Sequence, residues 1–380
     1  MPSCLIVPSS VNIEIGSPSQ LNYFNSERGK CHKISESRSP SDFLGRKVNV
    51  LIVTNFQRFP LTWTSKSGCS GKSIIASSTR DFLAQRTRAG LIFVVNCNPE
   101  LTFQLAAALW FRKSPPLIAV DLVLRRSFSL KTRLGVFARR LMLRRVNHHI
   151  FYFRDIVEYC RVYGIRPSQT SFVPFKASLR FDQDLAPDGN GEYVLCFGQS
   201  MRDFDTFFAA IEKLGYPAAI PEPDFAALAR HGSKFTCPLK ELPASIRLLP
   251  DDKSDEAQKA ILRDARLVVL PILRNNMVAS GISTSLNSML AGKCVIGTDG
   301  PGMSDIFGEE MLLAPPEDPE ALAGVIRRAW EDEELCRRTA EAGQRLAKSL
   351  GGEPELYERI IDAVVEWSLS AGEPCLSPPR

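Results

Sequence analysis

Short apolar runs alternate with helix-like stretches along most of this 380-residue chain. VNVLIVTNF (48–56), LIFVVN (91–96) and LVVLPI (267–272) are nearly continuous apolar runs, as strands buried on both faces are. Helices are expected between such runs, for example at 72–86 and 130–146. Because parallel strands need a crossover connection, usually a helix, this alternation predicts a parallel sheet with helices on both faces. We therefore expect an α/β protein of the doubly wound type.

The alternation stops once and then restarts. DQDLAPDGNGE (182–192) combines Pro, Gly and acidic residues without an apolar pattern, which is typical of a linker. The sequence thus predicts an N-terminal Rossmann-like domain over residues 47–184 and a C-terminal one over residues 190–350. A final helix is expected at 354–370, and we expect it to pack back on the N-terminal domain.

The two ends of the chain lack this pattern. Residues 1–46 are rich in Ser, Pro and Asn and show no sustained periodicity, so we expect a disordered leader. Residues 371–380 are expected to form a loose tail.

Charge is divided unevenly along the chain. The net charge is +5, yet residues 1–187 hold 27 Lys and Arg against 11 Asp and Glu. Such asymmetry predicts that one half faces an anionic partner, which is a membrane, a nucleic acid or a phosphorylated substrate. No apolar run approaches the roughly 18 residues of a membrane span. No RNP-like or helix-turn-helix signature accompanies the basic residues, so no nucleic-acid partner is expected.

The cysteines and histidines predict neither disulfides nor a zinc site. Ten cysteines are scattered without a C-x-x-C pair, and there are four histidines. Cys97, Cys196 and Cys294 lie inside apolar runs and are expected to be buried. Free cysteines suit a reducing compartment, so we expect a cytoplasmic protein.

The loop VASGIST (278–284) supplies a glycine and three hydroxyls just before an expected helix at 282–291. Free N–H groups and the helix dipole at such a position favour an anion, most simply a phosphate. The alternative is that Ser280 or Ser283 merely caps the helix. The spacing alone leaves both interpretations open.

The segment that contains this loop resembles a known family. VASGISTSLNSMLAGKCVIGTDGPGMSDIF (278–307) is similar to the donor-binding core of the retaining GT-B glycosyltransferases of family 4, the glycosyl transferases group 1 domain. The resemblance continues through residues 312–347 and covers CFGQSMRDFDTFFAAI (196–211). Over residues 47–181 only the element order and the stretch 163–175 support it. It implies a GT-B fold, in which two doubly wound Rossmann-like domains face each other across a cleft.

The resemblance also implies a function. Enzymes of this family move a sugar from a nucleotide-diphospho-sugar to an acceptor, so we expect a hexosyltransferase-like enzyme that acts with retention of configuration. The nucleotide-sugar is a substrate, and neither a cofactor nor a metal ion is implied. The acceptor, a glycan or a lipid-linked molecule, would be held mainly by the first domain. Two alternatives stay open: a nucleotide-sugar epimerase of the same fold, and a non-catalytic GT-B protein that binds a donor or a partner.

The matched motif supplies the candidate site residues. The resemblance implies a catalytic role for Arg202 and Asn287, since a cation is needed where the leaving diphosphate gains charge. The implied donor-binding residues are Gly198, Arg202, Ser280, Gly281, Ile282, Ser283, Thr284 and Asn287. A structural alternative for Arg202 is a helix-start pair with Asp203, in which Asp203 closes a capping box with Ser200.

The sequence departs from the family at two positions. The family's two glutamates, eight positions apart, fall on Ala279 and Asn287. An asparagine still hydrogen-bonds two ribose hydroxyls, but it brings no charge. This departure is what keeps the non-catalytic alternative open.

The first domain offers weaker candidates. SGCSGKS (67–73) is not a P-loop, because Lys66 stands where the first glycine is required. Gly68 and Gly71 are instead expected in a turn before a helix, either as a cleft loop near the donor phosphate or acceptor, or as a plain loop. Asn96 and Asp121 end predicted strands and are candidates for the acceptor site.

A basic stretch from Arg125 to Arg145 contains eight Lys and Arg and no acidic residue. Leu134, Phe137 and Leu141 recur at helical spacing within it. Either this apolar stripe packs on the sheet while the arginines are solvated, or the helix holds the protein peripherally on the anionic inner face of a membrane.

Overall fold

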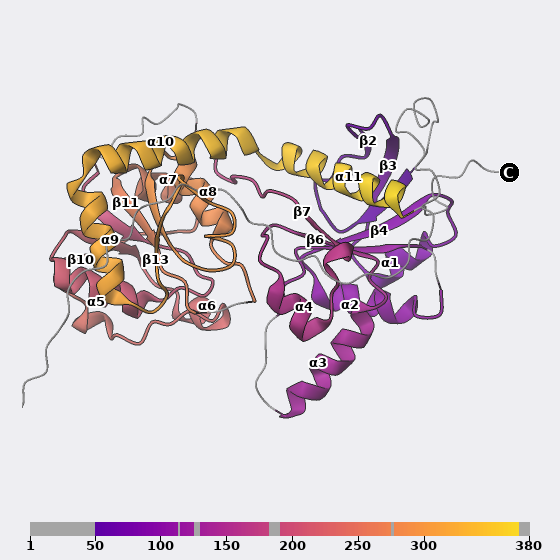
Figure 1. Cartoon of the computed structure of the whole chain (residues 1–380), viewed down its shortest axis with the longest axis horizontal. Coiled ribbons are helices and arrows are strands. Elements are labelled where there is room, and N and C mark those ends of the chain that lie inside the picture. The colour runs from indigo at the N-terminus through magenta and orange to yellow at the C-terminus, as the bar shows by residue number, and fades with distance from the viewer. Residues whose placement is uncertain (1–49, 113–114, 125–129, 182–190, 275–276, 372–380) are drawn as a thin grey trace, which may run out of the picture. The chain divides into compact units, whose positions relative to one another are not determined.

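The structure is a computed structural model of the chain. It describes residues 50–112, 115–124, 130–181, 191–274 and 277–371. The predicted leader, nearly all of the linker and the predicted tail lie outside the described residues. The predicted domain limits, 47–184 and 190–350, stay predictions, and the described residues form two separate sheets within them (Figure 1).

The first sheet has seven strands, in the order β2-β3-β1-β4-β5-β6-β7. All neighbours are parallel except β2 and β3, which form an antiparallel pair. The strands are β1 (Val50–Thr54), β2 (Thr62–Thr64), β3 (Ser70–Ile75), β4 (Leu91–Asn96), β5 (Leu117–Val120), β6 (His148–Phe151) and β7 (Thr170–Phe172). The connecting helices are α1 (Thr79–Ala84), α2 (Pro99–Ala108), α3 (Leu130–Leu143), α4 (Val157–Tyr163) and the 3-10 helix Pro167–Gln169.

Each face of this sheet has its own core. Phe93 and Val95 of β4 point to the face that α1 to α4 cover, whereas Ile92 and Val94 point to the other face. There the C-terminal helix α11 (Glu353–Ser370) packs against the strands through side chains such as Ile360 (Figure 1). Burial on both faces explains why these strands are continuous apolar runs in the sequence.

The second sheet has six parallel strands, in the order β10-β9-β8-β11-β12-β13. They are β8 (Tyr193–Cys196), β9 (Ala218–Pro221), β10 (Ile246–Leu249), β11 (Ala265–Leu270), β12 (Cys294–Thr298) and β13 (Leu312–Ala314). The helices are α5 (Phe204–Leu214), α6 (Phe225–Arg230), the 3-10 helix Leu239–Glu241, α7 (Asp255–Arg263), α8 (Ile282–Leu290), α9 (Pro319–Glu331) and α10 (Glu333–Leu350). Chain order reverses between β8 and β11, and ligands of doubly wound folds bind at such a switch point, beyond the carboxyl ends of the strands.

The structure corrects the predicted helix at 72–86. Residues 70–75 form β3 instead, which pairs with β1 on one side and β2 on the other. The helix α1 begins only at Thr79, where Ser78 and Asp81 form a capping box. Hydrogen bonds from two neighbouring strands outweigh the weak local preference of this segment, which is why a local pattern could not predict β3.

None of the helices in the described part of the chain is both long and apolar enough to cross a membrane.

Candidate functional site

Two loops meet at the switch point of the second sheet. Loop 197–203 follows β8, and the described loop residues 271–274 and 277–281 lie between β11 and α8. Because β8 and β11 are parallel neighbours, their carboxyl ends lie at the same edge of the sheet. This pair of loops, which we call the switch-point loops, contains half of the donor-binding residues predicted from the sequence, and the other half lie in α8.

Arg202 joins the switch-point loops. Its side chain is only 1% exposed, and Nε donates to the carbonyl oxygen of Phe197 at 2.8 Å. Nη1 donates to the carbonyl of Ser200 at 3.0 Å, and Nη2 donates to the hydroxyl of Thr284 at 3.1 Å. These bonds use three of the five guanidinium N–H groups. No carboxylate within the described ranges forms an ion pair with this side chain.

Burial lowers the pKa of the Arg202 guanidinium to about 10, so it stays charged at neutral pH. A buried cation without a counter-ion is costly, and an anion bound beside it would remove that cost. The predicted capping box of Ser200 with Asp203 is wrong, because Asp203 itself is the N-cap of α5 and accepts from the Thr206 N–H.

Two glycines make room for this guanidinium. Gly198 has φ +104°, and a Cβ there would lie 2.4 Å from Arg202 Nη2. Gly281 has φ +87°, and its Cβ would lie 3.4 Å from Nη1 and 2.5 Å from Met303 Cε. Both positions need glycine for backbone conformation and for space.

The first turn of α8 has no cap. Gly281 is its N-cap residue, and no side chain of the described residues accepts a hydrogen bond from the turn, whereas α5, α7, α9 and α10 are capped by Asp or Ser. The alternative that Ser280 caps α8 is wrong, since its hydroxyl donates to the Ser200 carbonyl at 2.7 Å. Three backbone N–H groups and the positive end of a helix dipole therefore accompany the Arg202 cation.

Asn287 lies one turn further along α8, where it is 7% exposed. Its Oδ1 accepts from the backbone N–H of Ser178 at 2.7 Å and of Leu179 at 3.1 Å. The Ser283 hydroxyl lies 3.5 Å from that of Ser178. The structure thus places the Asn287 oxygen on the segment that leaves the first sheet, a contact that the sequence did not predict.

The other candidates lie apart from the switch-point loops. Gly68 forms the turn of the β2–β3 hairpin with φ +80°, and Gly71 lies within β3 against Trp63, where a Cβ would approach Cζ2 at 2.2 Å. The Lys66 N–H donates to Asp362 of α11. The expected glycine-rich turn before a helix is therefore wrong.

The acceptor candidates lie at the carboxyl ends of β4 and β5. The backbone N–H and carbonyl of Asn96 are both bonded by the side chain of Asn55. Asp121 and its neighbour Cys97 have the unusual φ values +46° and +43°. Partial burial raises the pKa of the Asp121 carboxyl to about 6. Cys97 is exposed, not buried as predicted, whereas Cys196 and Cys294 are buried.

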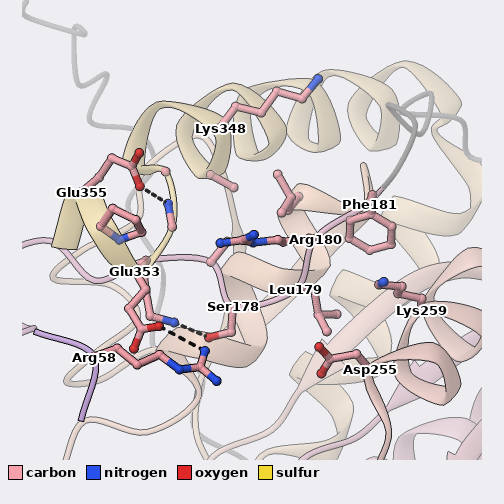
Figure 2. A pocket seen from close by; sticks show the side chains of 17 residues that line it. Arg58, Ser178, Leu179, Arg180, Phe181, Asp255, Lys259, Lys348, Glu353 and Glu355 are labelled. Atoms are coloured by element: carbon pink, nitrogen blue, oxygen red, sulfur yellow. Dashed lines mark hydrogen bonds and ion pairs between the residues drawn. The ribbon is translucent and has the colours of Figure 1, made fainter. Parts of the chain in front are cut away.

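A further cavity lies elsewhere. It has a volume of 1020 Å³ and is lined by the segments 176–181 and 351–355 and by Leu290, the last residue of α8. Figure 2 shows Arg180 extending across it and the ion pair between Arg58 and Glu353. None of the predicted donor residues lines it. Among the described residues, no three His, Cys, Asp or Glu side chains gather as metal ligands would.

Comparisons with known proteins show a family match and similar folds. Residues 238–346 match the family model described as glycosyl transferases group 1. The structure is similar to sucrose-phosphate synthase from Thermosynechococcus elongatus, with TM-score 0.58, 16% identity and coverage of 88% of this chain and 92% of that one. It is also similar to HepE from Anabaena in complex with UDP, with TM-score 0.55, 14% identity and coverage of 80% and 87%.

A third similar structure is the α,α-trehalose 6-phosphate synthase from Burkholderia multivorans, with TM-score 0.54, 11% identity and coverage of 88% and 100%. No curated protein sequence matches the chain. The predicted α/β fold class and GT-B architecture are confirmed by these likenesses, while membership of family 4 stays a prediction. Residues 238–346 therefore match the glycosyl transferases group 1 model, and the chain has the GT-B fold of these structures.

Proposed function

We propose that this protein is a glycosyltransferase that binds a nucleotide-diphospho-sugar at the switch-point loops and transfers its sugar with retention of configuration. The observation that carries the proposal is the buried Arg202 guanidinium, which has no carboxylate partner in the described chain and lies beside the uncapped first turn of α8. Both features favour a bound diphosphate. Structures of HepE with UDP and with UDP-glucose, which share this fold, support a nucleotide-sugar as the ligand.

The same groups would serve the chemistry. When the glycosidic bond breaks, negative charge develops on the leaving nucleoside diphosphate. Arg202 and the N–H groups of Ile282, Ser283 and Thr284 are fixed in place before the reaction, so they would stabilise that charge without rearrangement. Metal independence is part of the proposal, because these groups supply the positive charge.

The acceptor would lie at the first sheet, at the ends of β4 and β5. Asp121 is an acceptor-binding candidate because its carboxylate can accept a hydrogen bond from a sugar hydroxyl. We propose a glycan or a lipid-linked molecule as this acceptor.

Peripheral attachment to an anionic membrane completes the proposal. In α3, Phe137 is 67% exposed, and Arg139 and Arg140 are exposed as well, as is Arg144 directly after the helix. The alternative that Phe137 packs on the sheet is therefore wrong. An exposed aromatic side chain among arginines fits a headgroup region.

A non-catalytic donor-binding protein is the second candidate. It is favoured by Ala279 and by the Asn287 oxygen, which already accepts two backbone N–H groups. Donor binding would then persist without turnover.

Turnover separates the two candidates. We expect the protein to release nucleoside diphosphate from one of UDP-, GDP- or ADP-glucose, and Asn287→Glu, which introduces the family's residue, to retain or raise that rate. Asn287→Leu, which keeps the volume but has no oxygen, should abolish it. The measurement is nucleoside diphosphate released over time by a coupled assay. Binding without release in both the natural protein and Asn287→Glu would support the non-catalytic candidate.

A further inference from the structure

A cavity of 410 Å³ lies at the edge of the first sheet opposite Asn96 and Asp121. It is bordered by the C-terminal end of α3, the loop after α4 and the beginning of β6. In a parallel sheet, crossover helices end at the edge where the strands begin, whereas Asn96 and Asp121 follow strand ends. The cavity is thus separate from the proposed donor and acceptor sites.

Three arginines line this cavity, and none of its described lining residues is acidic. Arg140 lies in the last turn of α3, Arg144 directly follows that helix, and Arg166 comes from the loop after α4. Within the described residues, none of the three forms an ion pair, and Arg166 Nε donates to the side-chain oxygen of Gln169 at 3.0 Å. Three like charges around one cavity repel each other. A bound anion would replace this repulsion with attraction between the anion and each guanidinium.

The neighbouring Arg145 shows the structural use of an arginine. Its guanidinium donates to the carbonyls of Leu109 and Pro115 and to the side chain of Asn147. These bonds join the segment after α3 to the segments after α2 and before β6. The three cavity arginines have no such set of backbone carbonyls in the described structure, so packing alone does not account for them.

The lining of the cavity also contains a buried polar ring. His149 lines it, is 2% exposed, and its Nδ1 has no hydrogen-bond partner in the described structure. Burial lowers the pKa of its ring to about 3, so the imidazole is neutral and has one N–H donor. Buried polar atoms are nearly always bonded, so the His149 ring keeps an unused hydrogen-bonding nitrogen next to the arginines.

The loop backbone fits the same arrangement. Gly164 has φ +69°, and a Cβ there would lie 2.8 Å from the Arg140 Nε. Only a glycine lets the Arg140 guanidinium lie across this turn at the cavity mouth.

We propose that this cavity binds a phosphate monoester group. The guanidinium groups of Arg140, Arg144 and Arg166 would hold the phosphate, and the His149 ring forms part of the same lining. Guanidinium groups bind phosphate through paired hydrogen bonds, and a volume of 410 Å³ leaves room for the group to which the phosphate is attached. The phosphate belongs either to a lipid headgroup or to a free phosphorylated metabolite, and the experiment separates these sources. This inference does not rest on the proposed function, since it uses none of the donor residues.

Histidine ring NMR signals give a local readout in the full chain, which has four histidines. We expect inorganic phosphate to shift the His149 ring signals in a saturable way while the signals of His148 and His231 stay in place. The double variant Arg140→Gln/Arg166→Gln should weaken that binding by about tenfold or more. The matched control Arg86→Gln/Arg88→Gln removes the same charge from exposed positions between α1 and β4. It should leave the affinity for inorganic phosphate unchanged.

The source of the phosphate follows from vesicle sedimentation with phosphatidylcholine alone and with added phosphatidic acid. Binding to phosphatidic acid that inorganic phosphate competes away, and that the double variant loses, assigns the site to a lipid headgroup. A phosphate-dependent His149 shift without such binding assigns it to a free metabolite. Unchanged His149 signals up to high phosphate concentration, or equal affinity in the double variant and its control, would overturn the proposal. UDP binding is measured in a separate experiment. A failure to bind UDP would contradict the proposed donor site and would leave the phosphate proposal unaffected.

Discussion

At the scale of single residues, Arg202 links the two ends of the proposed donor site. Its guanidinium bonds groups on both switch-point loops, and Gly198 and Gly281 leave the space in which it lies. The sequence motif predicted all three residues. It did not predict that Arg202 would be buried, because burial depends on how the two loops pack against each other.

Replacing Arg202 tests its role. Arg202→Met keeps an unbranched apolar stem and removes the charge, so we expect UDP binding to weaken by about 1.5–3 kcal/mol, the range for hydrogen bonds to charged groups. Uridine, which has no phosphate, should bind as before, and titration calorimetry measures both. Thr284→Val is the control that removes one acceptor of Arg202 but keeps its charge. Equal losses for UDP and uridine would mean that Arg202 only holds the loops together.

Asp121 predicts a pH dependence of stability. Partial burial raises the pKa of its carboxyl to about 6 from its ordinary value of 3.8. The folded protein therefore holds this proton more tightly than the unfolded chain, so the contribution of Asp121 to stability is full below pH 3.8 and is lost as pH rises through 6.

The variant Asp121→Asn removes that titration and tolerates the positive φ of this position. We expect its Tm to exceed that of the natural protein at pH 8 and to match it near pH 4. The gain at pH 8 should be at most about 3 kcal/mol, which corresponds to two pKa units. A Tm difference that is the same at both pH values would show that Asp121 is not the titrating group.

Other residue contacts could not be predicted from sequence. Asn287 meets Ser178 and Leu179, which are more than 100 positions away in the chain. Cys97 follows a buried strand, and a local hydrophobic pattern cannot show that the chain turns outward there with φ +43°. Such contacts depend on tertiary packing.

At the scale of elements, local patterns predicted most strands and helices. Asp318 and Pro319 begin α9, and Gly215 ends α5 with φ +65°, as their capping preferences indicate. The patterns missed β2, β13 and α6, which are short. They also missed the β2–β3 hairpin, because its pairing of Trp63 with Gly71 is a contact between two strands that no single-strand pattern shows. Strand order, and with it the switch point between β8 and β11, is set by nonlocal pairing.

The exposed face of α3 gives a prediction at this scale. Each basic residue near an anionic leaflet contributes about 1 kcal/mol, and an exposed phenylalanine adds apolar contact. We expect salt-sensitive sedimentation with phosphatidylglycerol vesicles and little with phosphatidylcholine alone. Phe137→Ser/Arg139→Gln, which spares the three cavity arginines, should reduce that sedimentation severalfold. Equal sedimentation with both lipids at low salt would rule out membrane attachment through α3.

At the scale of the whole molecule, several contacts join residues around the two sheets. Asp305 accepts from the backbone N–H groups of Arg154 and Asp155 after β6, and Arg359 of α11 donates to the carbonyls of Pro174 and Phe175. With the Asn287 contacts, these bonds fix the segments that connect the sheets. The donor loops and the acceptor candidates are thus carried by one compact unit, residues 47–380.

The central claim is that the switch-point loops bind a nucleoside diphosphate, and thermal unfolding with ligands tests it most directly. The natural protein would be heated with UDP, GDP or ADP, with the corresponding sugar nucleotides, and with uridine as the phosphate-free control. A ligand at 100 times its Kd adds roughly 2.7 kcal/mol to the free energy of unfolding, which should raise Tm by roughly 4 °C for a unit of this size. We predict such a rise for the diphosphates of one base and no rise for uridine at the same concentration. If no nucleoside diphosphate or sugar nucleotide raises Tm, the switch-point loops do not form a donor site.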